Sequence, residues 1–145
     1  MTQENDVAPS HIIVTVSDYD RAVAFYTGAL GFSVGFERAA EEAFEPVFQL
    51  HDVKFREGFV VLGGMMLTLL CFERPDSIPA PVPAANRTGI KLIAFSVTDI
   101  DAVAGRIVAH GGQVLEHTRL KTHFGTQLIV TDPDGTQLEL VQRAT

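Results

Sequence analysis

The chain has 145 residues, of which 46% are hydrophobic, and its formal net charge at pH 7 is −7. This length supports one domain with a hydrophobic core, whereas two independent domains would each be small. Nucleic acids and anionic membrane surfaces require clustered lysine and arginine, so the acidic balance argues against both as partners.

The N-terminal segment and the cysteine content indicate the compartment. Residues 1–10, MTQENDVAPS, have neither the basic start nor the apolar run of a secretory signal, and we expect them to form a flexible N-terminus. The single cysteine, Cys71, has no partner for an internal disulfide. No segment approaches the roughly 18 uninterrupted apolar residues of a membrane-spanning helix. These features predict a cytoplasmic protein.

The first half of the chain begins with a strand followed by a helix. Apolar residues alternate with their neighbours over 12–16, which is the period of a strand. Ser17 or Asp18 can cap the following helix, and Gly31 can end it in a left-handed conformation. Three further strands are predicted, over residues 32–38, 47–62 and 65–72.

The second half repeats this order. The segment HIIVTVSDYD, 11–20, matches LIAFSVTDID, 92–101, in its apolar alternation and in the spacing of its aspartates. A strand is therefore predicted over 91–97, followed by a helix that Thr98 or Asp99 caps. The remaining predicted features are a helix stop at Gly111 and Gly112, strands at 113–119, 122–131 and 136–142, and a tight turn at DPDG, 132–135.

The predicted fold is α+β, with two βαβββ repeats that form a cupped mixed sheet around a central cavity. A single domain would cover 11–142, with repeat one at 11–72, an extended and exposed proline-rich linker at 73–89, and repeat two at 90–142. Strand alternation predicts which side chains face the cavity. Together with aromatic and basic neighbours, the predicted pocket-lining residues are Ile13, Thr15, Met66, Thr68, Leu70, Leu92, Ala94, Ser96, Gln137, Phe55, His123 and Phe124.

Three segments carry a family resemblance: HIIVTVSDYDRAVAFYTGALGF, LIAFSVTDIDA and DPDGTQLELV. Together they resemble the vicinal oxygen chelate superfamily, which holds glyoxalase I, methylmalonyl-CoA epimerase, ring-cleaving dioxygenases, fosfomycin-inactivating enzymes and metal-free bleomycin-binding proteins. The resemblance covers about residues 11–142 and indicates a fold, not one activity. It implies a small-molecule substrate or ligand, and a homodimer in which two chains can share their cavities.

In metal-dependent members, the resemblance implies, a divalent ion is held at four strand positions, which here are His11, Thr68, Leu92 and Glu139. Leucine cannot coordinate a metal, and a neutral threonine hydroxyl is a poor ligand. We therefore expect no required cofactor. A divalent ion would bind His11 and Glu139 only weakly, unless another histidine such as His51 or His123, or the substrate itself, completed its shell.

Glu139 and His11 are the candidate catalytic residues. Glu139 lies between Leu138 and Leu140, so a carboxylate that faces the cavity would have partly apolar surroundings suited to proton transfer, with His11 as its partner. Structural interpretations remain open for both. His11 could be a hydrogen-bonded residue at a strand start, and Glu139 an edge-strand residue that reaches water.

Three functions are compatible with these residues. The favoured one is an isomerase, lyase or cyclase that acts by proton transfer on an apolar carbonyl-bearing molecule without the standard metal centre. The second is a drug or natural-product binding protein that confers resistance by enclosing its ligand. The third is a metal-dependent lyase, epimerase or dioxygenase with a reduced ligand set. Residues 37–52 are predicted to form either a lid or a plain strand connection.

Overall fold

The computed structural model describes residues 6–40 and 44–145. Repeat one contains β1 (Ile12–Thr15), α1 (Tyr19–Leu30), β2 (Ser33–Ala40), α2 (Glu45–Phe48), β3 (Lys54–Leu62) and β4 (Met65–Arg74). Repeat two contains β5 (Ile93–Ser96), α3 (Ile100–Ala109), β6 (Gln113–Thr122), β7 (Gly125–Thr131) and β8 (Gln137–Arg143). Of the predicted flexible N-terminus, 6–10 has no regular structure, and 1–5 lies outside the described residues.

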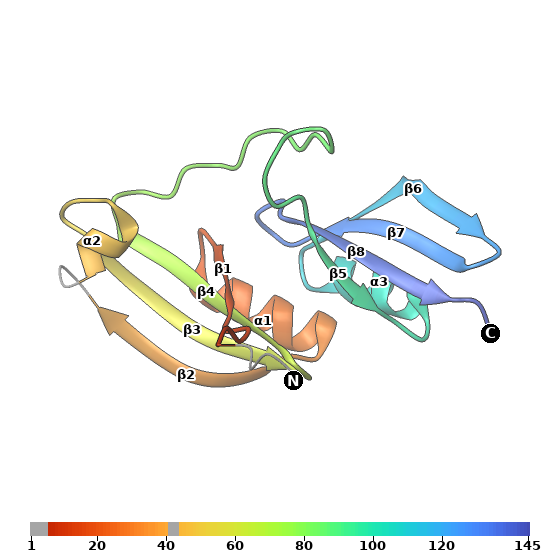
Figure 1. The fold of residues 1–145 in the computed structure, drawn as a ribbon, viewed down its shortest axis with the longest axis horizontal. Coiled ribbons are helices and arrows are strands. Elements are labelled where there is room, and N and C mark those ends of the chain that lie inside the picture. The colour runs from red at the N-terminus through yellow and green to blue at the C-terminus, as the bar shows by residue number, and fades with distance from the viewer. Residues whose placement is uncertain (1–5, 41–43) are drawn as a thin grey trace.

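Each repeat forms its own four-stranded mixed sheet. The first sheet has the strand order β1-β4-β3-β2, and the second has the matching order β5-β8-β7-β6. In both, the first and last strands of the repeat pair in parallel, and the other pairs are antiparallel. The two sheets occupy the two ends of the long axis of the molecule (Figure 1). The predicted α+β fold with two βαβββ repeats is confirmed.

The helix ends follow the predicted capping chemistry. The Asp18 carboxylate accepts a hydrogen bond from the Arg21 backbone N–H at 3.0 Å, and Asp99 accepts one from Ala102 at 3.1 Å. These bonds decide between the alternative caps in favour of the two aspartates. Gly31 ends α1 with φ of 80°, a left-handed conformation that glycine adopts without strain.

The larger hydrophobic core lies between the repeats. The helices α1 and α3 contact each other, and each covers one face of its own sheet. Buried residues on these covered faces are Val14, Val16, Leu67, Leu69, Ile93, Phe95, Leu138 and Leu140. Ile12 shares their strand phase but remains 38% exposed at the sheet edge.

Because a strand alternates its side chains, the opposite face of each sheet points away from this shared core. The helix-covered faces, not the open faces, meet inside the chain. The open faces of the two sheets are consequently separate surfaces of one molecule, and they do not enclose the predicted central cavity between them within a single chain.

The predicted strand over 47–62 is correct only from Lys54 onward. Pro46 occupies the start of the short helix α2, where its missing N–H costs no hydrogen bond, and Gln49 ends α2 in a left-handed conformation. The segment after residue 43 packs three apolar side chains, Phe44, Phe48 and Leu50, against the first sheet. We call the resulting cluster the aromatic wall; its other members are Val53, Phe55, Leu70 and Phe72.

The DPDG turn links the repeats through buried polar contacts. Gly135 N–H donates to the Asp132 carbonyl at 3.0 Å, which confirms the predicted turn. The buried Tyr26 hydroxyl of α1 donates to the Asp132 carboxylate at 2.8 Å, and that carboxylate also accepts two backbone N–H bonds within the turn. Burial raises the pKa of Asp132, and burial together with the nearby Asp132 charge raises the pKa of Tyr26.

The linker was predicted over 73–89; the exposed segment between the sheets covers 75–91, and β4 extends to Arg74, beyond its predicted end at residue 72. It runs along one side of the molecule from the first sheet to the second (Figure 1). Within the described residues, no helix has both the length and the apolar character needed to span a membrane.

Candidate functional site on the open sheet faces

The open face of the first sheet is defined by strand register. Ile13 pairs with Thr68 and Thr68 with Phe59, which forms one row across β1, β4 and β3. The next row is formed by Thr15, Leu70, Glu57 and Arg38. We call this surface the first open face; Met66 and Phe36 extend it, and the aromatic wall closes it at one end.

His11 lies at the other end of the first open face. Its Nδ1 is 2.8 Å from the Ser10 hydroxyl, and its ring meets the Phe59 ring edge-on at 5.6 Å between centroids. A shallow hollow of about 370 Å³ beside it is lined by residues of 9–12 and 64–66, Met66 among them. The imidazole is exposed and available to a ligand, and repeat two contributes nothing to this hollow.

Thr68 is 1% exposed, and its Oγ1 has no hydrogen-bond partner among the described residues. The predicted pocket residues Leu70 and Phe55 are also buried, as parts of the aromatic wall. Thr68, Leu70 and Phe55 are therefore buried beneath the first open face and do not form its exposed surface. Ile13 and Thr15 are exposed on it.

The first open face also carries an ion pair that the sequence did not predict. Arg38 Nε donates to Glu57 Oε1 at 2.5 Å, and the guanidinium carbon lies 4.4 Å from the centre of the Phe44 ring. The Glu57 side chain is only 6% exposed, whereas that of Arg38 is 38% exposed. A β-bulge between Val34 and Glu37 sets this register, and the sequence carried no signal for that bulge beyond Gly35.

The open face of the second sheet, called here the second open face, carries Glu139. This half-buried residue pairs with Ala94 on one side and Ile129 on the other. Among the described residues, no hydrogen bond or ion pair engages its carboxylate. Leu92 is half-buried just before β5, Ala94 and Ser96 are exposed, and Gln137 accepts a hydrogen bond from Lys91 Nζ.

His123 and Phe124 lie in the turn between β6 and β7, at the far end of the second sheet. Their ring centroids lie 3.9 Å apart with the ring planes tilted by 39°, and Phe124 is 76% exposed. His51, considered above as a further metal ligand, is exposed beside α2, with its Nδ1 3.8 Å from a Glu45 carboxylate oxygen. Within one chain, neither histidine is placed beside both His11 and Glu139.

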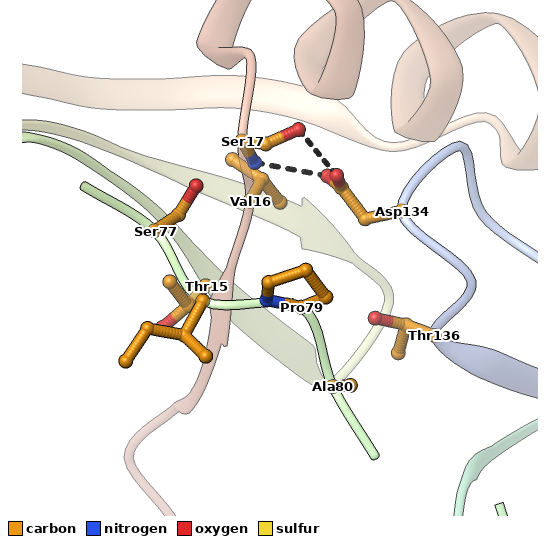
Figure 2. Close-up of a pocket in the computed structure, with 9 residues that line it drawn as sticks. Thr15, Val16, Ser17, Ser77, Pro79, Ala80, Asp134 and Thr136 are labelled. Carbon is orange, nitrogen blue, oxygen red and sulfur yellow. Dashed lines mark hydrogen bonds between the residues drawn. The ribbon is translucent and has the colours of Figure 1, made fainter. Parts of the chain in front are cut away.

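A separate hollow of about 280 Å³ lies where the linker passes the end of β1 and the DPDG turn. Figure 2 shows Ser17 at its rim with its backbone N–H and its hydroxyl directed at the Asp134 carboxylate. Arg21 pairs with the same carboxylate at 3.2 Å. Because Asp134 is already engaged by these donors, the contacts join the repeats and offer no free base.

The donor set does not fit the divalent ion of metal-dependent relatives. Leu92 has no donor atom, and the Thr68 hydroxyl is occluded. In the described part of the chain, no three histidine, cysteine, aspartate or glutamate side chains are grouped so that they could hold a metal ion. His11 and Glu139 are the two ligand types at the four positions, and they lie on different sheets.

Comparison with known proteins agrees with this architecture. The family model described as the Glyoxalase/Bleomycin resistance protein/Dioxygenase superfamily matches residues 8–140. The chain belongs to this superfamily. Members share the paired βαβββ fold and differ in activity, so membership leaves the reaction of this glyoxalase-superfamily protein open.

Individual relatives are distant in sequence. An uncharacterized Escherichia coli protein, YaeR, is 29% identical over 134 residues, which cover 92% of this chain and 94% of its own. A glyoxalase family protein from Bacillus cereus matches with a TM-score of 0.83 at 20% identity, covering 100% of this chain and 99% of its own. A fosfomycin resistance protein from Listeria monocytogenes matches with a TM-score of 0.63 at 19% identity, covering 97% and 94%. At these identities, the structural matches establish the fold alone.

Proposed function

We propose that this protein is a small-molecule isomerase, lyase or cyclase that moves a proton on an apolar carbonyl-bearing substrate, with Glu139 as general base or acid and His11 as its partner. The observation that carries the proposal is the unengaged Glu139 carboxylate, half-buried between the side chains of β5 and β7 on an open sheet face. A carboxylate without a cation partner is free to accept and return a proton.

The reaction requires no divalent ion at the standard position. Leu92 replaces a ligand with an aliphatic side chain directly beside the strand that carries Glu139, and this apolar neighbour favours the transfer of a proton over the binding of a cation. The chain itself would bind the substrate against apolar side chains, and Glu139 would remove or deliver the proton next to the carbonyl carbon.

The site would be completed in a homodimer. Each chain has two open faces that look away from its own core, and each face is bordered by a short strand, β1 or β5, with a single partner in its sheet. Apolar side chains remain uncovered there, Ile13 and Phe36 on the first face and Leu120 in the second sheet. If the first open face of one chain meets the second open face of another, the symmetric pair forms two cavities, each with one His11 and one Glu139.

A ligand-binding protein without catalysis is the second candidate. The aromatic wall and the exposed Phe36 ring would suit the enclosure of an apolar drug or natural product, which requires neither an acid nor a base. The two candidates differ in what they require of Glu139.

Hydrogen–deuterium exchange separates them. The protein is incubated in D2O with a panel of small ketones and 2-hydroxy ketones, and proton NMR follows the loss of the hydrogen next to the carbonyl. An enzyme should catalyse this loss for at least one compound, and Glu139→Gln should abolish it while leaving compound binding intact. Glu116→Gln, an exposed glutamate of the same repeat, is the matched control and should exchange like the wild type.

Equal exchange by wild type and Glu139→Gln would reject the proposed chemistry. Tight binding of a compound with no exchange in any of the three proteins would instead favour the binding protein. Dialysis against a chelator should leave the exchange rate unchanged, because no catalytic step passes through a metal.

A further inference from the structure

We propose that Arg38 is an anion-binding residue of the first open face, and that the ligand of this protein joins a carboxylate or phosphonate group to an apolar body. The inference rests on the proposed function only in taking the first open face as part of the ligand cavity. It adds the chemical class of the ligand and the residue that recognises its charged end.

The geometry of Arg38 goes beyond what a structural ion pair needs. Glu57 is buried and requires a cation, yet it engages only Nε of the guanidinium, at 2.5 Å. Among the described residues, no hydrogen bond engages either Nη atom. Four N–H donors therefore remain on the half-exposed end of the side chain.

The guanidinium is also held in one orientation. The Glu57 bond fixes one edge, and the Phe44 ring packs against its plane at 4.4 Å. A fixed planar fork is the geometry that binds a carboxylate or phosphate-like group through two parallel hydrogen bonds. Because these contacts already order the side chain, ligand binding would cost little additional conformational entropy.

Aromatic side chains lie near the Arg38–Glu57 pair. Phe36 on the same strand is 62% exposed, and its ring centroid lies 6.4 Å from that of Phe59. A ligand that places its anionic end on Arg38 would lay its remaining atoms across these rings, toward His11 at the far end of the face. The ligand class is thus a small organic anion with an aromatic or aliphatic body.

Charge alone does not make this site. Glu57 neutralises Arg38 formally, and the chain carries a net charge of −7. An anion would consequently be held by directional hydrogen bonds to the guanidinium fork and not by a positive field. Lysine, which is a compact point charge without that fork, should therefore fail to replace Arg38.

The test uses the full chain labelled with ¹⁵N and follows the Arg38 Nε–H signal, assigned by its absence in Arg38→Lys. Benzoate and phenylphosphonate are the anionic probes, and benzamide is the neutral probe of the same size. At constant ionic strength, at least one anion should shift the Arg38 signal saturably and benzamide should not. Because Arg38→Lys lacks this signal, binding by the Arg38 variants is followed through the backbone amide signals of Phe36 and Phe59. Arg38→Lys should weaken binding about tenfold or more, as expected for the loss of a charge-assisted pair of hydrogen bonds.

Two further variants control for misfolding and for the general loss of a positive charge. Arg38→Gln combined with Glu57→Gln removes both charges, so no unpaired buried carboxylate remains, and it should weaken binding as Arg38→Lys does. Arg56→Gln is the matched control, because Arg56 projects from β3 onto the helix-covered side, where it lies 4.0 Å from the Tyr19 ring centre. It should bind the probes like the wild type.

Several results would overturn the inference: no saturable shift with either anion, an equal shift with benzamide, or unchanged binding in Arg38→Lys. The readout is binding and not turnover, so the two proposals can fail separately. Intact anion binding in Arg38→Lys with lost exchange in Glu139→Gln would reject only the anion site. Weakened anion binding in Arg38→Lys, together with unchanged exchange in Glu139→Gln, would reject only the proton-transfer chemistry.

Discussion

The two repeats share one topology but offer different chemistry on their open faces. The first open face carries His11, the Arg38–Glu57 pair and the aromatic wall built by the segment before β3. The second open face carries Glu139 and Leu92, and its sheet joins β6 to β7 by a short hairpin with no counterpart of the aromatic wall. Under the two proposals, the first face would bind the ligand and supply His11, and the second would supply Glu139; this division would account for an imidazole in one copy of the duplicated strand and an aliphatic side chain in the other.

The largest effect is expected from a substitution in the aromatic wall, which should stabilise the fold far more than the exposed aromatic residue of the second repeat does. Phe55 is fully buried and contacts Phe44 and Phe48 edge-on, at 5.3 and 5.0 Å between centroids. Phe55→Ala should lower the free energy of unfolding by about 3–5 kcal/mol, measured by urea denaturation. Phe124→Ala, in the exposed turn of the other repeat, should change it by less than about 0.5 kcal/mol. Similar losses in both variants would contradict the asymmetry.

A second prediction concerns the contact that holds the repeats together. Tyr26→Phe removes the hydrogen bond to the buried Asp132 carboxylate and should cost about 1.5–3 kcal/mol at neutral pH. Because the folded pKa of Tyr26 is raised, the native protein keeps a phenol proton that the unfolded chain loses above about pH 10. The wild-type free energy of unfolding should then fall as the pH rises past 10, and fall less steeply in Tyr26→Phe. Parallel pH profiles of the two proteins would count against the buried phenol.

A third prediction concerns Leu92, the position where the second repeat has an aliphatic side chain instead of a metal ligand. If His11 and Glu139 meet in a homodimer, Leu92→His supplies a third donor and should bind Zn²⁺ at least about tenfold more tightly than the wild type, measured by calorimetry. Leu92→Ala controls for the loss of the isobutyl group and should not gain affinity. No gain in Leu92→His would mean that the three positions do not converge.

Much of the fold followed from patterns that the sequence displays directly. Strand alternation, the two aspartate caps, Gly31 and the DPDG turn each act over a few residues, so they predicted the repeats and the covered sheet faces. The start of β3 and the helix α2 were missed, because the phenylalanines of 44–55 suit a strand as well as they suit the aromatic wall. Arg38 and Glu57 were missed because a β-bulge sets their register.

The relative arrangement of the two repeats could not be predicted from local sequence patterns either. Alternation identifies the open faces but not the direction in which they point, which is decided by the packing of α1 against α3. The predicted pocket residues accordingly divide into exposed ones such as Ile13 and buried ones such as Thr68. The catalytic roles of His11 and Glu139 remain predictions.

The central claim is that the two faces act together only across two copies of the chain. Its direct test mixes His11→Ala chains with Glu139→Gln chains, after partial unfolding and refolding, and measures the deuterium exchange described above. Each variant alone should be inactive, and random pairing should restore about a quarter of the wild-type sites, because half the dimers would contain one intact His11–Glu139 site. A mixture that stays inactive, while native mass spectrometry shows that mixed dimers have formed, would contradict the account.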